Sequence, residues 1–107
     1  LILTIDDDRM VRKYIQVILK NEDYEVLEAE NGKQGLEMAI SEKPDIIILD
    51  IIMPGSDGFE VVEKLSEHGL ENALHIIILT SKDLSSEEKE YLKSKVNKIC
   101  KERRLKR

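Results

Sequence analysis

Short apolar runs alternate with longer amphipathic stretches along the whole chain. Residues 1–5, 46–49 and 76–79 are apolar runs rich in isoleucine, which is typical of parallel strands covered on both faces. Shorter apolar runs at 24–27 and 96–100 predict a second and a fifth strand. Because strands and helices alternate, the pattern predicts an α/β domain with a parallel sheet, right-handed crossovers and helices on both faces.

Start and stop signals divide the amphipathic stretches into four helices. Asn31 with Gln34, and Ser85 with Glu88, have the spacing of a capping box, and Gly69 stands where the third helix is expected to end. Apolar residues at helical spacing predict one buried stripe on each helix. The residues expected to face inward are Val11, Tyr14, Ile15, Ile18 and Leu19 in the first helix, Leu36, Ala39 and Ile40 in the second, Phe59, Val62 and Leu65 in the third, and Leu92 and Val96 in the fourth.

Composition and charge fit a single small domain spanning residues 1–107. With 41% hydrophobic and 36% charged residues, the chain can form one compact core. Its net charge of −5 disfavours direct nucleic-acid binding, and the basic segment 101–107 is interpreted as a helix start or a linker. No apolar run approaches the roughly 20 residues that span a bilayer, so no membrane insertion is expected. The single Cys100 excludes an internal disulfide and favours a reducing compartment, the cytoplasm.

The strongest functional signal is the position of polar side chains at strand ends. Asp6 and Asp7 follow the first strand, Asp50 follows the third, and Thr80 ends the fourth. The carboxyl ends of parallel strands share one rim, where ligands bind at the topological switch point. If the first and third strands are neighbours, three carboxylates converge there, and Mg²⁺ would balance their repulsion. A carboxylate beside such an ion can accept a phosphoryl group, to which the Thr80 hydroxyl can donate a hydrogen bond.

Each of these residues also has an ordinary structural interpretation. Asp6 and Asp7 suit a helix N-terminus, where acids complement the helix dipole, and Asp8 is interpreted in that way. Asp50 alone suits a turn, and Thr80 alone suits a strand end. Their coincidence at three separate strand ends favours the functional interpretation.

Several segments match one known family in place as well as in residue type. The segment 46–60, IIILDIIMPGSDGFE, resembles the phosphorylation loop of receiver domains of two-component signalling almost position for position. The opening segment 2–8, with Arg12, resembles the family's apolar strand closed by an acidic pair. LTSKD at 79–83 is similar to the segment that carries its switch hydroxyl. The resemblance covers almost the whole chain, and LDIIMPGSDG is its most specific part.

The resemblance implies a flavodoxin-like, doubly wound fold with five parallel strands in the order 2-1-3-4-5. It implies that Asp50 is the phosphoacceptor and that Asp6, Asp7, Asp50 and the backbone carbonyl of Ile52 bind Mg²⁺. Thr80 would turn toward the phosphoryl group and so switch an output surface. The donor would be a phosphohistidine of a sensor histidine kinase or a histidine phosphotransfer protein. The chain is therefore expected to be a signalling domain with at most slow self-phosphorylation and autodephosphorylation, and not an enzyme.

The C-terminal end departs from the family's pattern. Receiver domains carry a phosphoryl-contacting lysine at the end of the fifth strand, and the usual spacing from Thr80 lands on Glu102, one residue after Lys101. Either a loop is one residue shorter and Lys101 is that lysine, which we favour, or phosphotransfer is impaired, because a one-residue slip reverses the face of a strand side chain. No aromatic switch residue stands near Ile99. The last helix of the family is expected to be missing, so residues 1–107 are expected to be truncated or part of a longer protein.

Two alternatives to a phosphoacceptor domain stay open. A Mg²⁺-dependent phosphohydrolase would use an aspartyl nucleophile, but such enzymes carry a second aspartate two residues later, where this chain has Ile52. A pseudo-receiver would bind a partner without efficient phosphotransfer; Glu102 favours it, and the complete acidic triad disfavours it. The segment 79–88 resembles receivers attached to hybrid sensor kinases more than receivers fused to DNA-binding domains.

Overall fold

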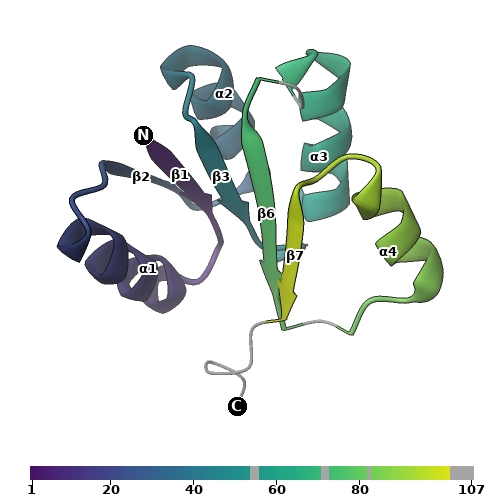
Figure 1. The fold of residues 1–107 in the computed structure, drawn as a ribbon, viewed down its shortest axis with the longest axis horizontal. Coiled ribbons are helices and arrows are strands. Elements are labelled where there is room, and N and C mark those ends of the chain that lie inside the picture. The colour runs from purple at the N-terminus through teal and green to yellow at the C-terminus, as the bar shows by residue number, and fades with distance from the viewer. Residues whose placement is uncertain (54–55, 71–72, 82, 102–107) are drawn as a thin grey trace.

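One parallel sheet forms the centre of the molecule. The computed structural model describes residues 1–53, 56–70, 73–81 and 83–101. Within these residues five strands pair in parallel in the order β2-β1-β3-β6-β7 (Figure 1), which confirms the order 2-1-3-4-5 expected of the five strands. Their bounds are β1 (Ile2–Ile5), β2 (Val26–Ala29), β3 (Ile46–Leu49), β6 (His75–Thr80) and β7 (Lys98–Lys101). A small antiparallel pair, β4 (Ile52–Met53) with β5 (Ser56–Asp57), lies inside the segment 46–60 that resembles the family's phosphorylation loop.

Four helices accompany the sheet in the described part of the chain. They are α1 (Arg9–Asn21), α2 (Gly32–Glu42), α3 (Gly58–Glu67) and α4 (Ser86–Lys93). In Figure 1, α1 lies on one side of the sheet, and α2, α3 and α4 lie on the other. The rings of Phe59 in α3 and Tyr91 in α4 are 6.2 Å apart, so these two helices are in contact. The doubly wound architecture predicted from the alternation of elements is therefore confirmed.

Side-chain caps set the beginning of each helix. The carboxylates of Asp8 and Asp57 accept hydrogen bonds from the amides of Met10 and Phe59, at 2.9 Å each, where α1 and α3 begin. Ser85 forms the predicted capping box with Glu88 at the start of α4. The N-cap residues of the four helices, in chain order, are Asp8, Asn31, Asp57 and Ser85. Of these, the cap at Asp57 was not anticipated from the sequence.

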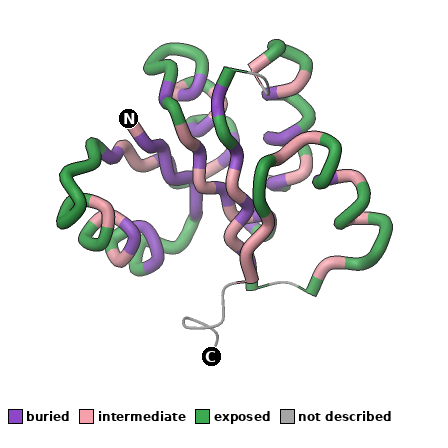
Figure 2. Tube along the Cα trace, viewed as in Figure 1, coloured by how far each residue is buried: buried purple, intermediate pink, exposed green. Residues whose placement is uncertain are grey.

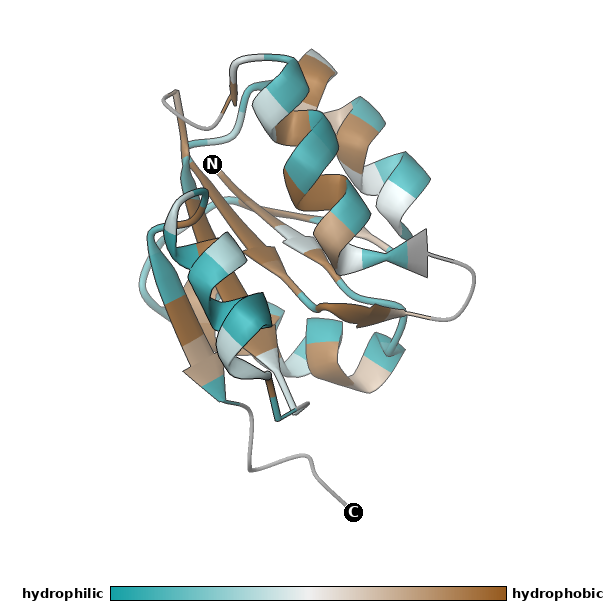
Figure 3. Cartoon of the chain, turned by 90° about the vertical axis from the view of Figure 1, so that its right-hand side faces the viewer, coloured by the Kyte–Doolittle hydropathy of each residue, from teal (hydrophilic) through white to brown (hydrophobic). Residues whose placement is uncertain are grey.

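The core lies between the sheet and the helices α2, α3 and α4. The aligned registers Ile5↔Leu49 and Leu49↔Ile78 place fully buried side chains next to one another. Figure 2 shows the buried positions along the central strands, and Figure 3 shows the same strands as the hydrophobic layer between the helices. Gly35 belongs to this packing, because a Cβ atom there would lie 2.5 Å from the Ile5 side chain. The central strands thus hold their carboxyl ends in fixed register.

The structure corrects several details of the sequence prediction. The second strand begins two residues later than expected, at Val26, because β2 pairs with β1 from the register Ile2↔Val26 onward. Ile18 is 45% exposed, although α1 was expected to bury it: the helix packs on β1 and β2 mainly through Val11 and Ile15.

The inner face of α2 differs from the expected one at a single position. Ala39 is buried as expected and Leu36 packs against the core, but Ile40 is 43% exposed. Gly32 and Gly35 are buried beside Ala39, because the close approach of Gly35 to Ile5 sets the rotation of the helix. Val96 lies beyond the end of α4, where its amide donates to the carbonyl of Leu92. None of the helices in the described ranges is long and apolar enough to cross a membrane.

Candidate functional site

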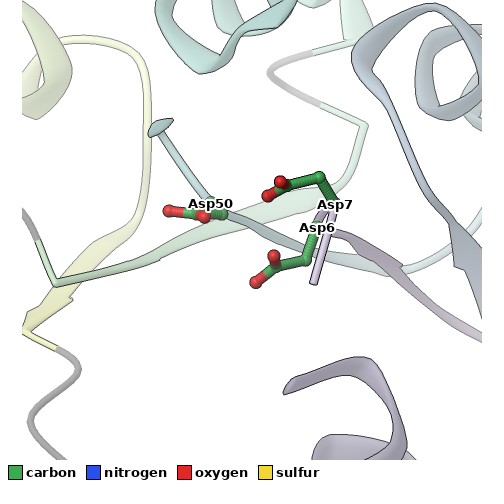
Figure 4. A group of neighbouring side chains, drawn as sticks. All are labelled: Asp6, Asp7 and Asp50. Atoms are coloured by element: carbon green, nitrogen blue, oxygen red, sulfur yellow. The ribbon is translucent and has the colours of Figure 1, made fainter. Parts of the chain in front are cut away.

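Three carboxylates gather at the carboxyl ends of β1 and β3. Asp6 and Asp7 follow β1 and Asp50 follows β3, and the amide of Asp50 donates to the carbonyl of Ile5 at 3.0 Å. One carboxylate oxygen from each of the three residues lies within 4.8 Å of those of the other two. Figure 4 shows the three side chains at this rim, each coming from the end of a strand. The convergence predicted from strand-end positions is therefore present.

Asp6 is the most deeply buried of the three. Only 6% of the residue is exposed, and its carboxylate accepts a hydrogen bond from the amide of Asp8 at 2.9 Å. Burial raises the pKa of Asp6 to about 7, and the charges of Asp50, Asp7 and Asp8 add to the rise, while the hydrogen bond from Asp8 opposes it. The ionised form of Asp6 is therefore unfavourable in the metal-free fold, and a bound cation would stabilise it.

Asp50 is half-buried and receives several hydrogen bonds. Burial raises its pKa above the ordinary value, and the amides of Ile52 and Ile51 and the side chain of Thr80 lower it in part. The amide of Ile52 lies 3.3 Å from the carboxylate. Thr80, at the end of β6, is 2% exposed, so its hydroxyl is held beside Asp50 by the sheet itself. The structure thus brings together four of the side chains selected from the sequence.

The backbone behind Asp50 is shaped by Gly58, whose role the sequence analysis did not identify. A Cβ atom at this position would lie 2.5 Å from the Cα of Ile51 and 2.6 Å from the carbonyl oxygen of Asp50. The Gly58 amide donates to the carbonyl of Ile51 at 2.9 Å. Only glycine permits this approach of the start of α3 to the phosphoacceptor segment predicted above. The sequence feature from which this role could have been recognised is the second glycine of the motif GSDG, Gly58.

The donor set at the rim suits a hard divalent cation. A cavity of about 140 Å³ is lined by the acidic residues Asp6, Asp7, Asp8 and Asp50 together with Val11, Leu79 and Ser81. Its oxygen donors are carboxylates, which Mg²⁺ prefers, and the open volume can hold the water ligands that Mg²⁺ keeps. Asp8 is committed to capping α1, as the sequence analysis expected. The residues present therefore fit a magnesium site made by Asp6, Asp7 and Asp50.

Lys101 lies beside this site but is turned to another partner. The register of β6 with β7 pairs Thr80 with Lys101, so both side chains belong to the same face of the sheet. The Lys101 ammonium forms an ion pair with Asp83 in the segment between β6 and α4. Lys101 and Asp83 line a second cavity of about 290 Å³ together with Thr80. Glu102, the competing position, lies outside the described residues, and the choice between the two stays a prediction.

Comparison with known proteins identifies the same family over most of the chain. The model of the family described as "Response regulator receiver domain" matches residues 2–104. The protein PilH of Pseudomonas aeruginosa is 38% identical over 82 residues, which cover 77% of this chain and 68% of PilH. The response regulator MprA of Mycolicibacterium vanbaalenii is 40% identical over 86 residues, covering 80% of this chain but 36% of MprA. The chain thus spans about a third of the length of that relative.

A similar fold has been solved with a ligand. The response regulator protein TrrA from Thermotoga maritima, in complex with Mg²⁺-BeF, is 30% identical, with a TM-score of 0.82. The match covers 97% of this chain and 87% of TrrA.

Proposed function

Because the chain belongs to the family of response regulator receiver domains, we propose that it is a phosphoacceptor signalling domain in which Asp50 carries the phosphoryl group. The observation that carries this proposal is the placement of Asp50 within 4.8 Å of two further carboxylates at one rim of the sheet. A lone aspartate at a strand end would not need such neighbours. The same arrangement supports Mg²⁺ as the cofactor, since three converging carboxylates repel one another without a cation.

The proposed reaction forms an acyl phosphate on the Asp50 side chain. A carboxylate oxygen of Asp50 attacks the phosphorus of the donor, and the bond between phosphorus and the donor's nitrogen or oxygen breaks, with the electron pair leaving on the donor. Bound Mg²⁺ would supply charge neutralisation for the transferring oxygens. The amide of Ile52 and the Thr80 side chain orient the Asp50 carboxylate. Thr80 would then exchange Asp50 for the bound phosphoryl group as its partner.

Two further roles belong to the same proposal. The carbonyl of Ile52 would be a metal ligand beside the three carboxylates. Lys101 would leave Asp83 and contact the phosphoryl oxygens, because it is the register partner of Thr80. The natural donor would be a phosphohistidine of a sensor kinase or phosphotransfer protein in a cytoplasmic compartment. The readout would be a change in the surface that an output domain or partner binds.

Intact-mass measurement with a small phosphodonor tests the proposal. The protein is incubated with acetyl phosphate and Mg²⁺, and the wild type is compared with Asp50→Asn and with the matched control Asp8→Asn. Asp8 lines the same cavity, and asparagine can still cap α1, so the control removes one acid without removing the acceptor. We expect a gain of one phosphoryl group in the wild type and the control, and none in Asp50→Asn.

Two other outcomes would point to the alternatives. No mass gain in the wild type, with Mg²⁺ present, would contradict the proposal and favour a pseudo-receiver. Rapid multiple turnover of an organic phosphate would contradict it in favour of a hydrolase. Ile52 at the position of the usual second aspartate argues against that second result.

A further inference from the structure

Arg12 is a buried cation beside the acidic site. It lies in the first turn of α1, is 9% exposed, and uses its guanidinium in two directions. One nitrogen, Nη1, donates to the backbone carbonyl of Asp6 at 2.7 Å, and Nε donates to the carboxylate of Glu28 in β2 at 3.0 Å. Burying a charge is costly unless it is paired and hydrogen-bonded, and an apolar residue would pack α1 on the sheet without that cost. The position therefore calls for a reason other than packing.

The carbonyl that Arg12 contacts belongs to the peptide unit joining Asp6 to Asp7. Rotation of this peptide would change the direction of both carboxylates at once. The amide of Asp6 donates to the carbonyl of Ala29 at 3.1 Å, so β2 holds one side of the residue. Arg12 holds the other side, and Glu28 anchors Arg12 to the same strand. The acidic turn is thus fixed to β2 at both ends of Asp6.

Arg12 reaches the backbone of the site without occupying its carboxylates. Its hydrogen bonds go to a carbonyl and to Glu28, and those oxygens are not part of the acidic cluster of Asp6, Asp7 and Asp50. A guanidinium bound to a carboxylate of the cluster would compete with a metal ion for the same oxygens. On the carbonyl, the same group orients the carboxylates and leaves their oxygens to the cation. The charge of Arg12 is balanced by Glu28, so the cluster keeps its excess of negative charge.

From this geometry we propose that Arg12, held by Glu28, is the positioning residue that sets the Asp6–Asp7 turn for cation binding. The inference rests on the proposed function, because the cation in question is Mg²⁺. The planar guanidinium of arginine has donors in two directions, so it can bond a carbonyl and a carboxylate at once. The single ammonium of lysine cannot reach both with the same geometry. In this role Arg12 acts only through the backbone of Asp6, and its two donors leave the carboxylates of the cluster untouched.

Calorimetric titration with Mg²⁺ alone tests this proposal. The variants are Arg12→Met, Arg12→Lys and Glu28→Gln, with Arg9→Met as the matched control because Arg9 is an exposed arginine on the same helix. We expect Arg12→Met to raise the dissociation constant about tenfold or more, as is typical when a group orienting a metal ligand is removed. Arg12→Lys is expected to restore the charge but little of the affinity, Glu28→Gln to weaken binding less, and Arg9→Met to leave it unchanged.

A packing variant separates positioning from a general loss of stability. Ile15→Val removes one methylene from the buried face of α1, and its melting temperature provides the comparison. Unchanged affinity in Ile15→Val with weakened affinity in Arg12→Lys supports the proposal, even if Arg12→Met does not fold. Equal affinity in the wild type and Arg12→Lys, or equal weakening in Arg9→Met or Ile15→Val, would overturn it. If the wild type itself bound no Mg²⁺ and gained no phosphoryl group, the proposed function would fail instead.

Discussion

The carboxyl ends of β1 and β3 and those of β6 and β7 meet at the same rim of the sheet, but they differ in burial and partners. At the first pair, Asp6 is buried and its backbone is held by β2 and by Arg12. At the second pair, Thr80 is buried, but Lys101 is bound to Asp83, whose side chain is 88% exposed. The acidic half is therefore assembled in advance, whereas under the proposed function Lys101 would have to leave Asp83 when a phosphoryl group arrives.

We expect the greatest loss of stability when the backbone behind Asp50 is disturbed. In Gly58→Ala the added methyl group meets backbone atoms of Ile51 and Asp50, which cannot move aside as a side-chain tip can. We expect a loss of about 2–3 kcal/mol in the free energy of unfolding, measured by urea titration, together with reduced phosphorylation. Gly69→Ala is the control: its φ of 71° is strained for alanine, but no atom lies within 4 Å, so it should cost about 1–2 kcal/mol and leave phosphorylation unchanged. Equal phosphorylation in the two variants would contradict the role given to Gly58.

Removing the buried carboxylate of Asp6 should stabilise the metal-free protein, whereas Gly58→Ala should destabilise it. Asp6→Asn eliminates a charge that burial penalises, and asparagine can still accept the hydrogen bond from the Asp8 amide. We expect the metal-free protein at pH 8 to be stabilised by on the order of 2 kcal/mol in urea titrations. The same variant should show little stabilisation by added Mg²⁺, because it has lost a ligand. A destabilised metal-free variant would show that Asp6 supports the fold in some other way.

The metal-free protein should also become less stable as rising pH ionises Asp6. The pKa of Asp6 is about 7 in the folded protein and near 3.8 in the unfolded chain, so between these values the folded state binds more protons. The free energy of unfolding of the metal-free protein should therefore fall as pH rises through this window, by at most about 1.4 kcal/mol per pH unit for one group, and then level off above pH 8. The raised pKa of Asp50 adds to the same trend. Thermal melts in a chelator from pH 5 to 8 measure the slope, which should be shallower in Asp6→Asn; equal slopes would contradict the assignment.

The smallest effects on stability are expected in the other half of the rim. Asp83→Asn breaks an exposed ion pair, so the free energy of unfolding should change by less than about 1 kcal/mol. Beryllofluoride, a phosphoryl mimic, should bind at least as tightly to this variant, since Lys101 no longer has to leave Asp83. Lys101→Ala should weaken beryllofluoride binding, while Glu102→Ala should not. Weakening only in Glu102→Ala would show that the family's lysine position is occupied by Glu102.

Much of this architecture could be predicted from the sequence because its signals are local. The run of isoleucines before Asp50 marks a central strand, and strand-end polar residues meet automatically once parallel strands are in register. Exposure at Ile18 and Ile40 could not be predicted in this way, because periodicity gives an apolar stripe without saying how far the sheet extends beneath it. The role of Gly58 likewise depends on a distance between segments that only the folded chain defines.

The contacts made by the charged side chains of Arg12 and Lys101 could not be predicted from the sequence either. Arg12 could be recognised as part of a familiar opening segment, but its contact with the Asp6 carbonyl depends on the angle at which α1 leaves β1. The pairing of Lys101 with Asp83 depends on the path of the segment between β6 and α4. Because the spacing from Thr80 runs across that same segment, it could not decide between Lys101 and Glu102.

Mapping the modified residue by mass spectrometry decides whether Asp50 is the phosphoacceptor. The wild-type protein is treated with acetyl phosphate, once with Mg²⁺ and once with a chelator, then digested at acidic pH and sequenced by mass spectrometry. We expect one phosphoryl group, located on Asp50, that forms with Mg²⁺ and is lost or strongly reduced in the chelator. A phosphoryl group on another residue, or equal modification of Asp50 without the metal ion, would contradict this expectation.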